Sequence, residues 1–176
     1  MPNHVKTVIK FKKMKQYEVV DLVNSICGRD PEDPLDYYID FDKIIPEPRK
    51  KEDCPESCRR TEDSHVEEDA ERPWYDWYKW RLRYWDTKWG AYDCHTNIKL
   101  TGVTFVFSTA WSPAIPIFTT LATRYHYDME VMWADEDYGS NCGKMKYERE
   151  SDMITWTPPI DMKDPVRFAK RLWSEY

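Results

Sequence analysis

One stretch of the sequence carries both of the periodicities that decide the fold: residues 103–125, VTFVFSTAWSPAIPIFTTLATRY. In its first part, large apolar residues recur at every second position from Val103 to Phe107, which is the period of a β-strand. In its second part, apolar residues recur three and four positions apart, which is typical of a helix packed by one face. We expect Ser112 to cap this helix and Pro113 to be its first residue, where the missing N–H costs nothing.

The same two patterns continue on both sides of this stretch. Residues 4–11 alternate like a strand with one wet face, and residues 13–27 repeat like a helix that Gly28 ends. Thr101-Gly102 predicts the turn of a hairpin. We expect further strands at residues 36–42, 94–100, 127–133, 145–147 and 154–156, and further helices at residues 74–89 and after Asp164-Pro165.

These elements follow one another in the order β-α-β-(insert)-α-β-β-α-β-β-β-α. Strands of period two with only some intervening helices predict an α+β fold, with helices on one face of a mostly antiparallel sheet. The split β-α-β of the ferredoxin-like fold fits this order, with extra strands and a C-terminal helix added to it.

The 176 residues are enough for one domain, spanning residues 1–176. Within it, residues 49–72 contain no large apolar side chain other than Val66. Such a segment cannot offset the entropy cost of its own ordering, because it has too little apolar surface to bury. We therefore expect an exposed, mobile insert there.

The segment 74–89 is rich in aromatic residues, which form two stripes on a helix. One stripe consists of Tyr75, Tyr78, Leu82, Trp85 and Trp89, and the other of Trp77, Trp80 and Tyr84. A helix needs only one apolar stripe to pack on a sheet. The second stripe is therefore either a second buried face or a partner surface, since Trp, Tyr and Arg dominate binding hot spots. We expect Trp85 and Trp89 to be core residues and Trp80 to be less buried.

The chain is acidic overall, with a formal net charge of −6. Its mean hydropathy is low, −0.82, but an aromatic content of 15% indicates a folded protein. Lysines cluster near the start of the chain and acids at Asp135-Glu136-Asp137. These acids are either part of a mixed, solvated surface or a face for a basic partner. A general nucleic-acid binder needs a basic footprint, so the composition does not favour nucleic acid as a partner.

The sequence also indicates a compartment. No segment is apolar enough to span a bilayer, and the start of the chain lacks the apolar core of a secretory signal. We therefore expect a cytoplasmic protein with no membrane partner, in which the five cysteines are reduced.

Cys54, Cys58 and His65 are the candidate metal ligands. Structural zinc commonly uses two ligand pairs, and the second pair is missing, because Cys94 and His95 are adjacent in the chain. The cysteine spacings also fit no iron–sulfur pattern. We expect no cofactor and no iron–sulfur cluster, with Cys54 and Cys58 as plain thiols of a polar insert.

Cys94 and His95 also suggest a nucleophile with its base. However, no glycine-rich elbow surrounds Cys94, and the sequence has no phosphate-binding loop, dinucleotide fingerprint or His-Glu-x-x-His motif. No catalytic residue is assigned on these grounds.

Four ordered segments resemble the YubB-type ferredoxin-like domain family of phages, plasmids and other mobile elements. They are Met1-Pro2-Asn3-His4-Val5, residues 41–48, residues 85–91 and residues 107–113. Asp86 stands where this family usually has Gly, and Ala114 where a second Pro is common. The resemblance implies a mobile-element origin and a ferredoxin-like fold without an iron–sulfur cluster. It carries over no catalytic residue.

We therefore expect a non-catalytic protein that binds a host protein, as an inhibitor of host defence would. The expected binding residues are Trp77, Trp80, Arg81, Tyr84, Lys88, Asp135, Glu136 and Asp137. The alternative function is a small enzyme or a zinc-dependent nucleic-acid-associated factor.

Overall fold

The computed structural model describes residues 3–33 and 36–176, so Met1-Pro2 of the first resembling segment lies outside the described residues. The strands are β1 (His4–Phe11), β2 (Cys27–Arg29), β3 (Tyr37–Ile39), β4 (Tyr92–Lys99), β5 (Gly102–Ala110), β6 (Met129–Asp135), β7 (Cys142–Glu148) and β8 (Met153–Thr157). The α-helices are α1 (Gln16–Ile26), α2 (Phe41–Ile44), α3 (Trp77–Tyr84), α4 (Ile115–Tyr125) and α5 (Pro165–Glu175). Short 3-10 turns cover Lys51–Asp53, Glu56–Cys58 and Pro159–Asp161.

Six strands form one antiparallel sheet in the order β4-β5-β1-β6-β7-β8. The first four, together with α1 and α4, make the β-α-β-β-α-β arrangement of the ferredoxin-like fold, and β7 and β8 extend the sheet. The α+β, ferredoxin-like prediction is confirmed. β1 lies at the centre of this arrangement, because it pairs with β5 on one side and with β6 on the other.

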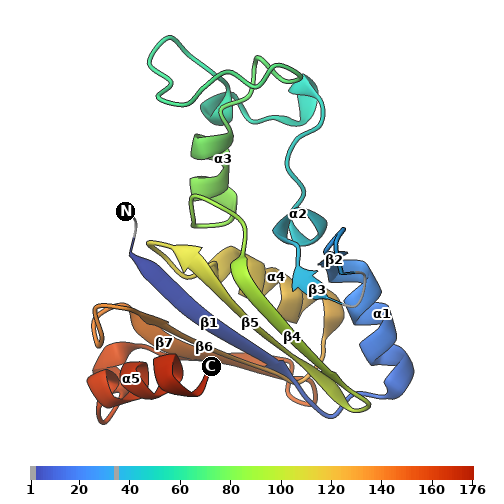
Figure 1. Ribbon diagram of the computed structural model, residues 1–176, viewed down its shortest axis with the longest axis vertical. Helices are drawn as coiled ribbons and strands as arrows, with labels where there is room; N and C mark the ends of the chain where they lie inside the picture. Colours follow the sequence, from blue (N-terminus) through green and yellow to red (C-terminus); the bar gives the residue numbers. More distant parts are fainter. Residues whose placement is uncertain (1–2, 34–35) are drawn as a thin grey trace.

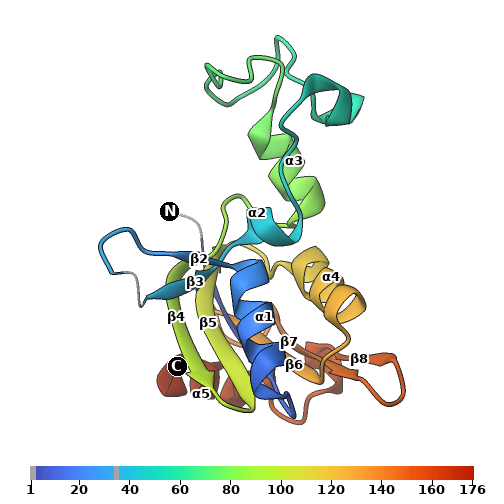
Figure 2. The same ribbon diagram turned by 90° about the vertical axis from the view of Figure 1, so that its right-hand side faces the viewer.

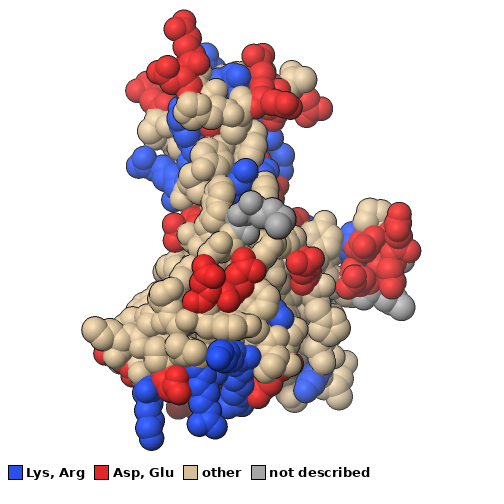
Figure 3. Space-filling model, turned by 60° about the vertical axis from the view of Figure 1, so that its left-hand side comes forward, with Lys and Arg blue, Asp and Glu red and all other residues tan. Residues whose placement is uncertain are grey.

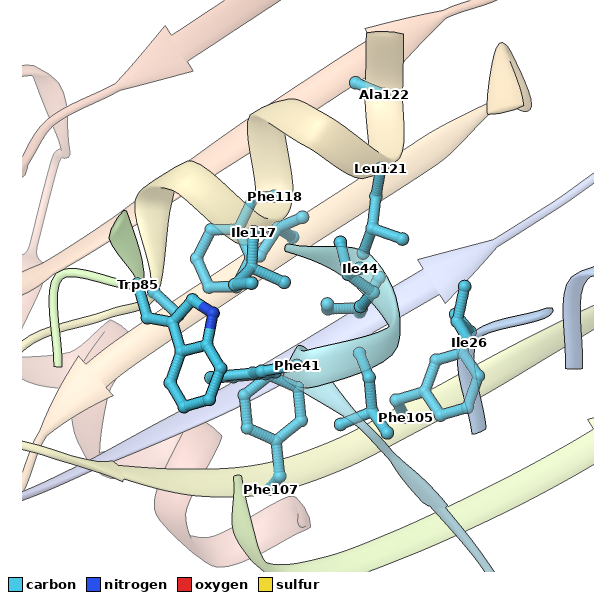
Figure 4. Packing of buried hydrophobic residues seen from close by; sticks show 14 of the residues in the cluster. Ile26, Phe41, Ile44, Trp85, Phe105, Phe107, Ile117, Phe118, Leu121 and Ala122 are labelled. Carbon is cyan, nitrogen blue, oxygen red and sulfur yellow. The ribbon is translucent and has the colours of Figure 1, made fainter. Parts of the chain in front are cut away.

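The two faces of the sheet are covered differently (Figures 1 and 2). Helices α1 and α4 pack on one face and bury the main core there, where Phe41 meets Phe107 edge-on with ring centroids 5.7 Å apart (Figure 4). Helix α5 packs on the opposite face, where Leu172 joins Val8 and Val106 in a second, smaller cluster. The alternating pattern of β1 accounts for both clusters, because Val8 and Ile9 point to opposite faces.

The segment 36–42 differs from its prediction. It forms a shorter strand, β3, which pairs with β2 instead of joining the main sheet. The strand ends early because the Asp40 carboxylate accepts a hydrogen bond from the Asp42 N–H, 3.0 Å, and so caps α2. This short helix then places Phe41 and Ile44 in the core.

Helix α4 begins later than predicted. Ser112 does not cap it, because the Ile115 N–H donates to the Pro113 carbonyl, 2.9 Å, in a turn that precedes the helix. Pro116, instead of Pro113, lies in the first turn. The corresponding prediction for α5 is confirmed, since the Asp164 carboxylate accepts from the Arg167 N–H, 2.9 Å, and Pro165 follows it.

Residues 46–84, called the head below, project from one end of the sheet (Figures 1 and 2). The outgoing and returning parts of the head are hydrogen-bonded, with the Arg60 N–H donating to the Trp74 carbonyl at 2.9 Å and the Asp76 N–H to that of Cys58 at 3.2 Å. Cys54 and Cys58 are buried in it. Residues 49–72 thus have packed contacts that their composition did not indicate.

Candidate functional site

Helix α3 forms the central part of the head, and Asp76 fixes where it begins. The Asp76 carboxylate accepts hydrogen bonds from the Lys79 N–H at 3.0 Å and from the Ser64 hydroxyl at 2.7 Å. Burial opposes the ionisation of Asp76, but these hydrogen bonds and the Lys79 ammonium lower its pKa below the ordinary value. Asp76 thus joins the cap of α3 to the loop that contains Ser64.

The second aromatic stripe does not point outward as a whole. Trp80 is 4% exposed, because its ring stacks on Tyr84 and meets the edge of Trp85. The expectation that Trp80 lies on an exposed face is wrong. Trp77 and Tyr84 are half-buried. The physical reason is that α3 stands away from the sheet, so that the insert, and not the sheet, packs along it.

The first stripe is also divided. Trp85 is buried as expected, since its Nε1–H donates to the Ile45 carbonyl at 2.9 Å and its ring packs against Phe41 (Figure 4). Trp89, which was expected to be a core residue, is 37% exposed, and so is Leu82 of the same predicted stripe. Helix α3 ends at Tyr84, so Trp89 is not on its stripe at all.

Arg81 serves the structure of the head. Its Nε lies 2.5 Å from an oxygen of the buried Glu47, whose other oxygen lies 3.2 Å from Arg72. The guanidinium of Arg81 also covers the rings of Trp77 and Trp85, 5.1 and 5.2 Å from their centroids. Arg81 therefore joins α3 to Glu47, near the start of the head, and to Trp85, just after its end. Its charge is paired with the Glu47 carboxylate.

Lys88 lies among three aromatic rings. Its Nζ is 4.8 Å from the ring centroid of Trp89, 5.4 Å from that of Trp111 and 5.9 Å from that of Tyr78. Trp111 is 41% exposed and Trp89 37%. We call these four residues the Lys88 patch. It joins the head, through Tyr78, to the end of β5.

Trp111 is held in an unusual backbone conformation, with φ at +67°. Bulky residues rarely adopt this left-handed region, because Cβ crowds the backbone. Two hydrogen bonds hold it there: the Trp111 N–H donates to the Asn3 carbonyl at 2.9 Å, and the Asn141 side-chain amide donates to the Trp111 carbonyl at 3.0 Å. The backbone that carries the exposed ring of Trp111 is thus held by two remote segments of the chain.

The acidic turn, Asp135-Glu136-Asp137, lies beside Trp111, because the Asn141 side chain contacts both Trp111 and Asp135. Asp135 is buried and accepts from the Asp137 N–H at 2.9 Å and from the Asn141 side chain at 3.3 Å, so it has a structural role. Asp137 accepts from the Asn3 side chain at 2.7 Å, and Glu136 from the His4 N–H at 3.0 Å. Both of these carboxylates are exposed.

The candidate metal ligands do not form a centre. Cys54 and Cys58 are close to each other, with the Cys54 thiol 3.5 Å from the Cys58 carbonyl oxygen, while His65 is exposed. Across residues 3–33 and 36–176, no three His, Cys, Asp or Glu side chains come together as a group that could hold a metal ion. Burial raises the pKa of the Cys54 thiol, which disfavours the thiolate that metals bind.

Cys94 and His95 point to opposite faces of β4. Cys94 packs against the main core, whereas His95 lies opposite Val106, which belongs to the cluster under α5. Burial raises the pKa of the Cys94 thiol to about 12, so the thiol is protonated at neutral pH. The pair is therefore not arranged as a nucleophile and its base.

Of the eight predicted binding residues, the structure brings three to one surface, namely Lys88, Glu136 and Asp137, around Trp111 and Asn3. Four of the others lie in the head, namely Trp77, Trp80, Arg81 and Tyr84. The last, Asp135, is the buried first residue of the acidic turn. Sequence reasoning missed Trp111, because no local signal marks its left-handed conformation. Trp89 was expected to be a core residue of a helix over residues 74–89, but α3 ends at Tyr84 and Trp89 lies beyond it.

In the described part of the chain, no helix has the length and apolar character needed to cross a membrane. Residues 85–164 match a protein family described as the ferredoxin-like domain in Api92-like protein. No curated protein and no solved structure gives a significant match. The matched segment holds β4 to β8 and α4, and therefore Lys88, Trp89, Trp111 and the acidic turn. Residues 85–164 are thus similar to a ferredoxin-like domain, and β1 and α1, which precede them, complete that fold.

Proposed function

We propose that this protein is a non-catalytic binding protein of a mobile element, and that it acts on a host protein in the cytoplasm of the host cell. Interference with host defence is the use that fits such a gene. The proposal rests on the resemblance of four segments to the YubB-type family, and on one surface of the molecule, the Lys88 patch with its neighbouring acids.

The composition of the Lys88 patch supports this proposal. Tryptophan and tyrosine dominate the binding energy at protein interfaces, because their large rings bury much apolar area at a low entropy cost. In the Lys88 patch, Trp89 and Trp111 expose about two fifths of their surface and lie around one ammonium group. Glu136 and Asp137 add polar groups at the rim, where interfaces are usually polar.

The left-handed backbone of Trp111 is the observation that carries most weight. Residues in such conformations cost roughly 1–3 kcal/mol and cluster at functional sites. Here two hydrogen bonds, from Trp111 to Asn3 and from Asn141 to Trp111, hold the costly conformation, and the result is an exposed ring instead of a buried one. An exposed ring held by a costly backbone conformation supports the proposal of a partner that binds the ring.

The experiment is capture of a bacterial protein by the immobilised chain, followed by reconstitution with the purified captured protein. The variants are Trp111→Ala and Trp89→Ala. The matched control is Trp156→Ala, since Trp156 on β8 is 41% exposed, like Trp111, but lies outside the Lys88 patch. We expect each patch variant to lose about 2 kcal/mol or more of binding energy, and the control to bind normally.

Equal binding by all three variants would remove the Lys88 patch from the proposal. Turnover of a small-molecule substrate by the purified chain would remove its non-catalytic part. Thermal melting of each variant ensures that lost binding does not reflect lost folding.

A further inference from the structure

The uncovered part of the sheet carries a second surface of a different character. Helix α5 covers β1, β6 and β7 on its face of the sheet, but it leaves β4 and part of β5 open. There lies a groove of about 610 Å³ between the end of α5 and the β4–β5 hairpin. Its floor includes His95, Asn97 and Thr104, which point away from the main core.

The groove is basic in an acidic protein. It is lined by four lysines, Lys10, Lys12, Lys13 and Lys99. Glu175 is its single acidic lining residue, and that carboxylate lies 2.6 Å from Arg171. Figure 3 shows Lys and Arg side chains gathered at the end of the molecule opposite the head, while acidic side chains crowd the far end of the head.

Two of these lysines are available to a ligand. Lys12 is paired with Glu130 at 2.5 Å and Lys13 with Asp128 at 2.9 Å. Lys10 donates to the hydroxyl of Tyr176 and covers its ring, and it lies opposite Glu130 on β6. Because the Glu130 carboxylate is already paired with Lys12, one carboxylate faces two lysines, and Lys10 forms no ion pair of its own among the described residues. Lys99 is exposed and forms no ion pair with the residues that the structure describes. The groove therefore presents uncompensated positive charge beside the rings of Tyr176 and His95.

We propose that this groove binds single-stranded nucleic acid, with Lys10 and Lys99 on the phosphate backbone and with bases against Tyr176 and His95. Single strands are bound by basic grooves combined with rings on which bases stack. The open sheet of small α+β modules can hold two or three unstacked bases in this way. Asn97 and Thr104 supply hydrogen-bonding groups for base edges on the floor.

The rings of the groove favour a nucleic acid over an acidic peptide. Bases stack on aromatic rings while lysines hold the phosphates between them, whereas the carboxylates of a peptide would use the lysines alone. Among the described lining residues of the groove, Tyr176 and His95 supply rings beside the four lysines. The overall charge of −6 excludes a general nucleic-acid surface, but it does not bear on a local groove at one end of the molecule.

The test is fluorescence anisotropy with a labelled mixed-sequence single strand of about 12 nucleotides, at salt concentrations from about 50 to about 200 mM. The groove variant is Lys10→Glu/Lys99→Glu. The control is Lys50→Glu/Lys51→Glu, which makes the same charge change on two exposed lysines of the head. Lys99→Ala is the milder second variant, used if the double variant melts early.

We expect the groove variant to bind at least about tenfold more weakly, and the control to stay within about twofold. The slope of log K against log salt should fall in magnitude by about 1.4 in the groove variant, because each lost phosphate contact contributes about 0.7 for single strands. Trp111→Ala should bind normally, which separates this site from the Lys88 patch.

Three results would overturn the proposal. The first is no binding by the wild-type chain at about 50 mM salt. The second is an equal loss in the groove and control variants, which would mean that only net charge matters. The third is competition by polyglutamate as strong as that by unlabelled oligonucleotide, which would assign the groove to an acidic peptide.

Discussion

Thr87 and Ala110 hydrogen-bond to each other in both directions. The Thr87 hydroxyl donates to the Ala110 carbonyl at 2.9 Å and accepts from the Ala110 N–H at 3.1 Å. Thr87 is fully buried, and it lies in the loop between the head and β4, while Ala110 ends β5. One side chain thus satisfies the backbone at the end of a strand and fixes the loop that carries Lys88 and Trp89.

Replacement of Thr87 by valine keeps the shape of the side chain and removes the hydroxyl. We expect Thr87→Val to lower the free energy of unfolding by about 1–3 kcal/mol, because the buried Ala110 N–H loses its side-chain acceptor. The Ala110 carbonyl loses one of two donors and keeps the Ser112 N–H at 2.9 Å. Thr87→Ser retains the hydroxyl and should lose clearly less. Denaturant unfolding of the two variants gives the comparison, and equal losses would mean that packing of the methyl group matters instead.

Asp86 occupies a backbone position that suits glycine. Helix α3 is followed by Trp85 in a helical conformation and then by Asp86 at φ +63°, the place where helices commonly end with a left-handed glycine. Glycine suits this position because it has no Cβ to crowd the backbone at positive φ. We expect Asp86→Gly to leave stability unchanged or raise it by up to about 1 kcal/mol, since the steric cost of Cβ disappears.

Asp86→Val is the contrasting variant at the same position. A β-branched side chain is disfavoured at positive φ, so this variant should melt below the wild type. If valine is tolerated as well as glycine, the left-handed conformation at Asp86 contributes no strain. Thermal melts of both variants at one pH decide the matter.

The tryptophans of residues 74–89 should differ in their effect on stability according to their burial and not according to their helical stripe. Trp80 and Trp85 are 4% and 3% exposed, so replacement of either by alanine should cost about 3–5 kcal/mol, as for Trp in a protein core. Trp89→Ala should cost much less, because Trp89 is 37% exposed. The measurement is urea unfolding of all three variants. A mild Trp80→Ala beside a severe Trp89→Ala would contradict the packing of the head.

Asp76 should make the stability of the head depend on pH. Its folded pKa lies below the ordinary value of 3.8, so its ionised form stabilises the folded state above that pH. This contribution is lost as the pH falls through the folded pKa. Asp76→Asn retains a capping oxygen but cannot ionise. We expect it to melt below the wild type at neutral pH, and the difference to vanish in strong acid.

The melting temperatures of the wild type and Asp76→Asn at about pH 7 and about pH 2.5 test this expectation, since only the difference between them isolates one carboxylate. A constant difference between the two conditions would mean that the ionised form of Asp76 does not stabilise the head. Near-UV circular dichroism of the clustered tryptophans reports whether the head is the part that changes.

Much of the fold could be read from the sequence, because its signals are local. The alternation of Val5, Ile9 and Phe11 is a property of one segment, and so is the cap formed by Asp164 before Pro165. Local patterns also place the hairpin at Thr101-Gly102 and give the order of elements, which leaves few ferredoxin-like arrangements open. The sequence by itself therefore determined the fold class and the order of the strands and helices of the main sheet, but it did not predict β2 and α2.

Tertiary structure alone decided which aromatic rings are buried. The pattern of residues 74–89 is the same whether a sheet or an insert covers the helix. The turn Glu56–Cys58, which contacts α3, lies well before it in the chain. Trp111 is exposed because Asn3 and Asn141 hold its backbone, and the two lie far from each other in the sequence. The basic groove likewise exists because β1, the β4–β5 hairpin and α5 meet at one end of the sheet. Such surfaces arise from contacts between remote segments, and a local periodicity carries no information about them.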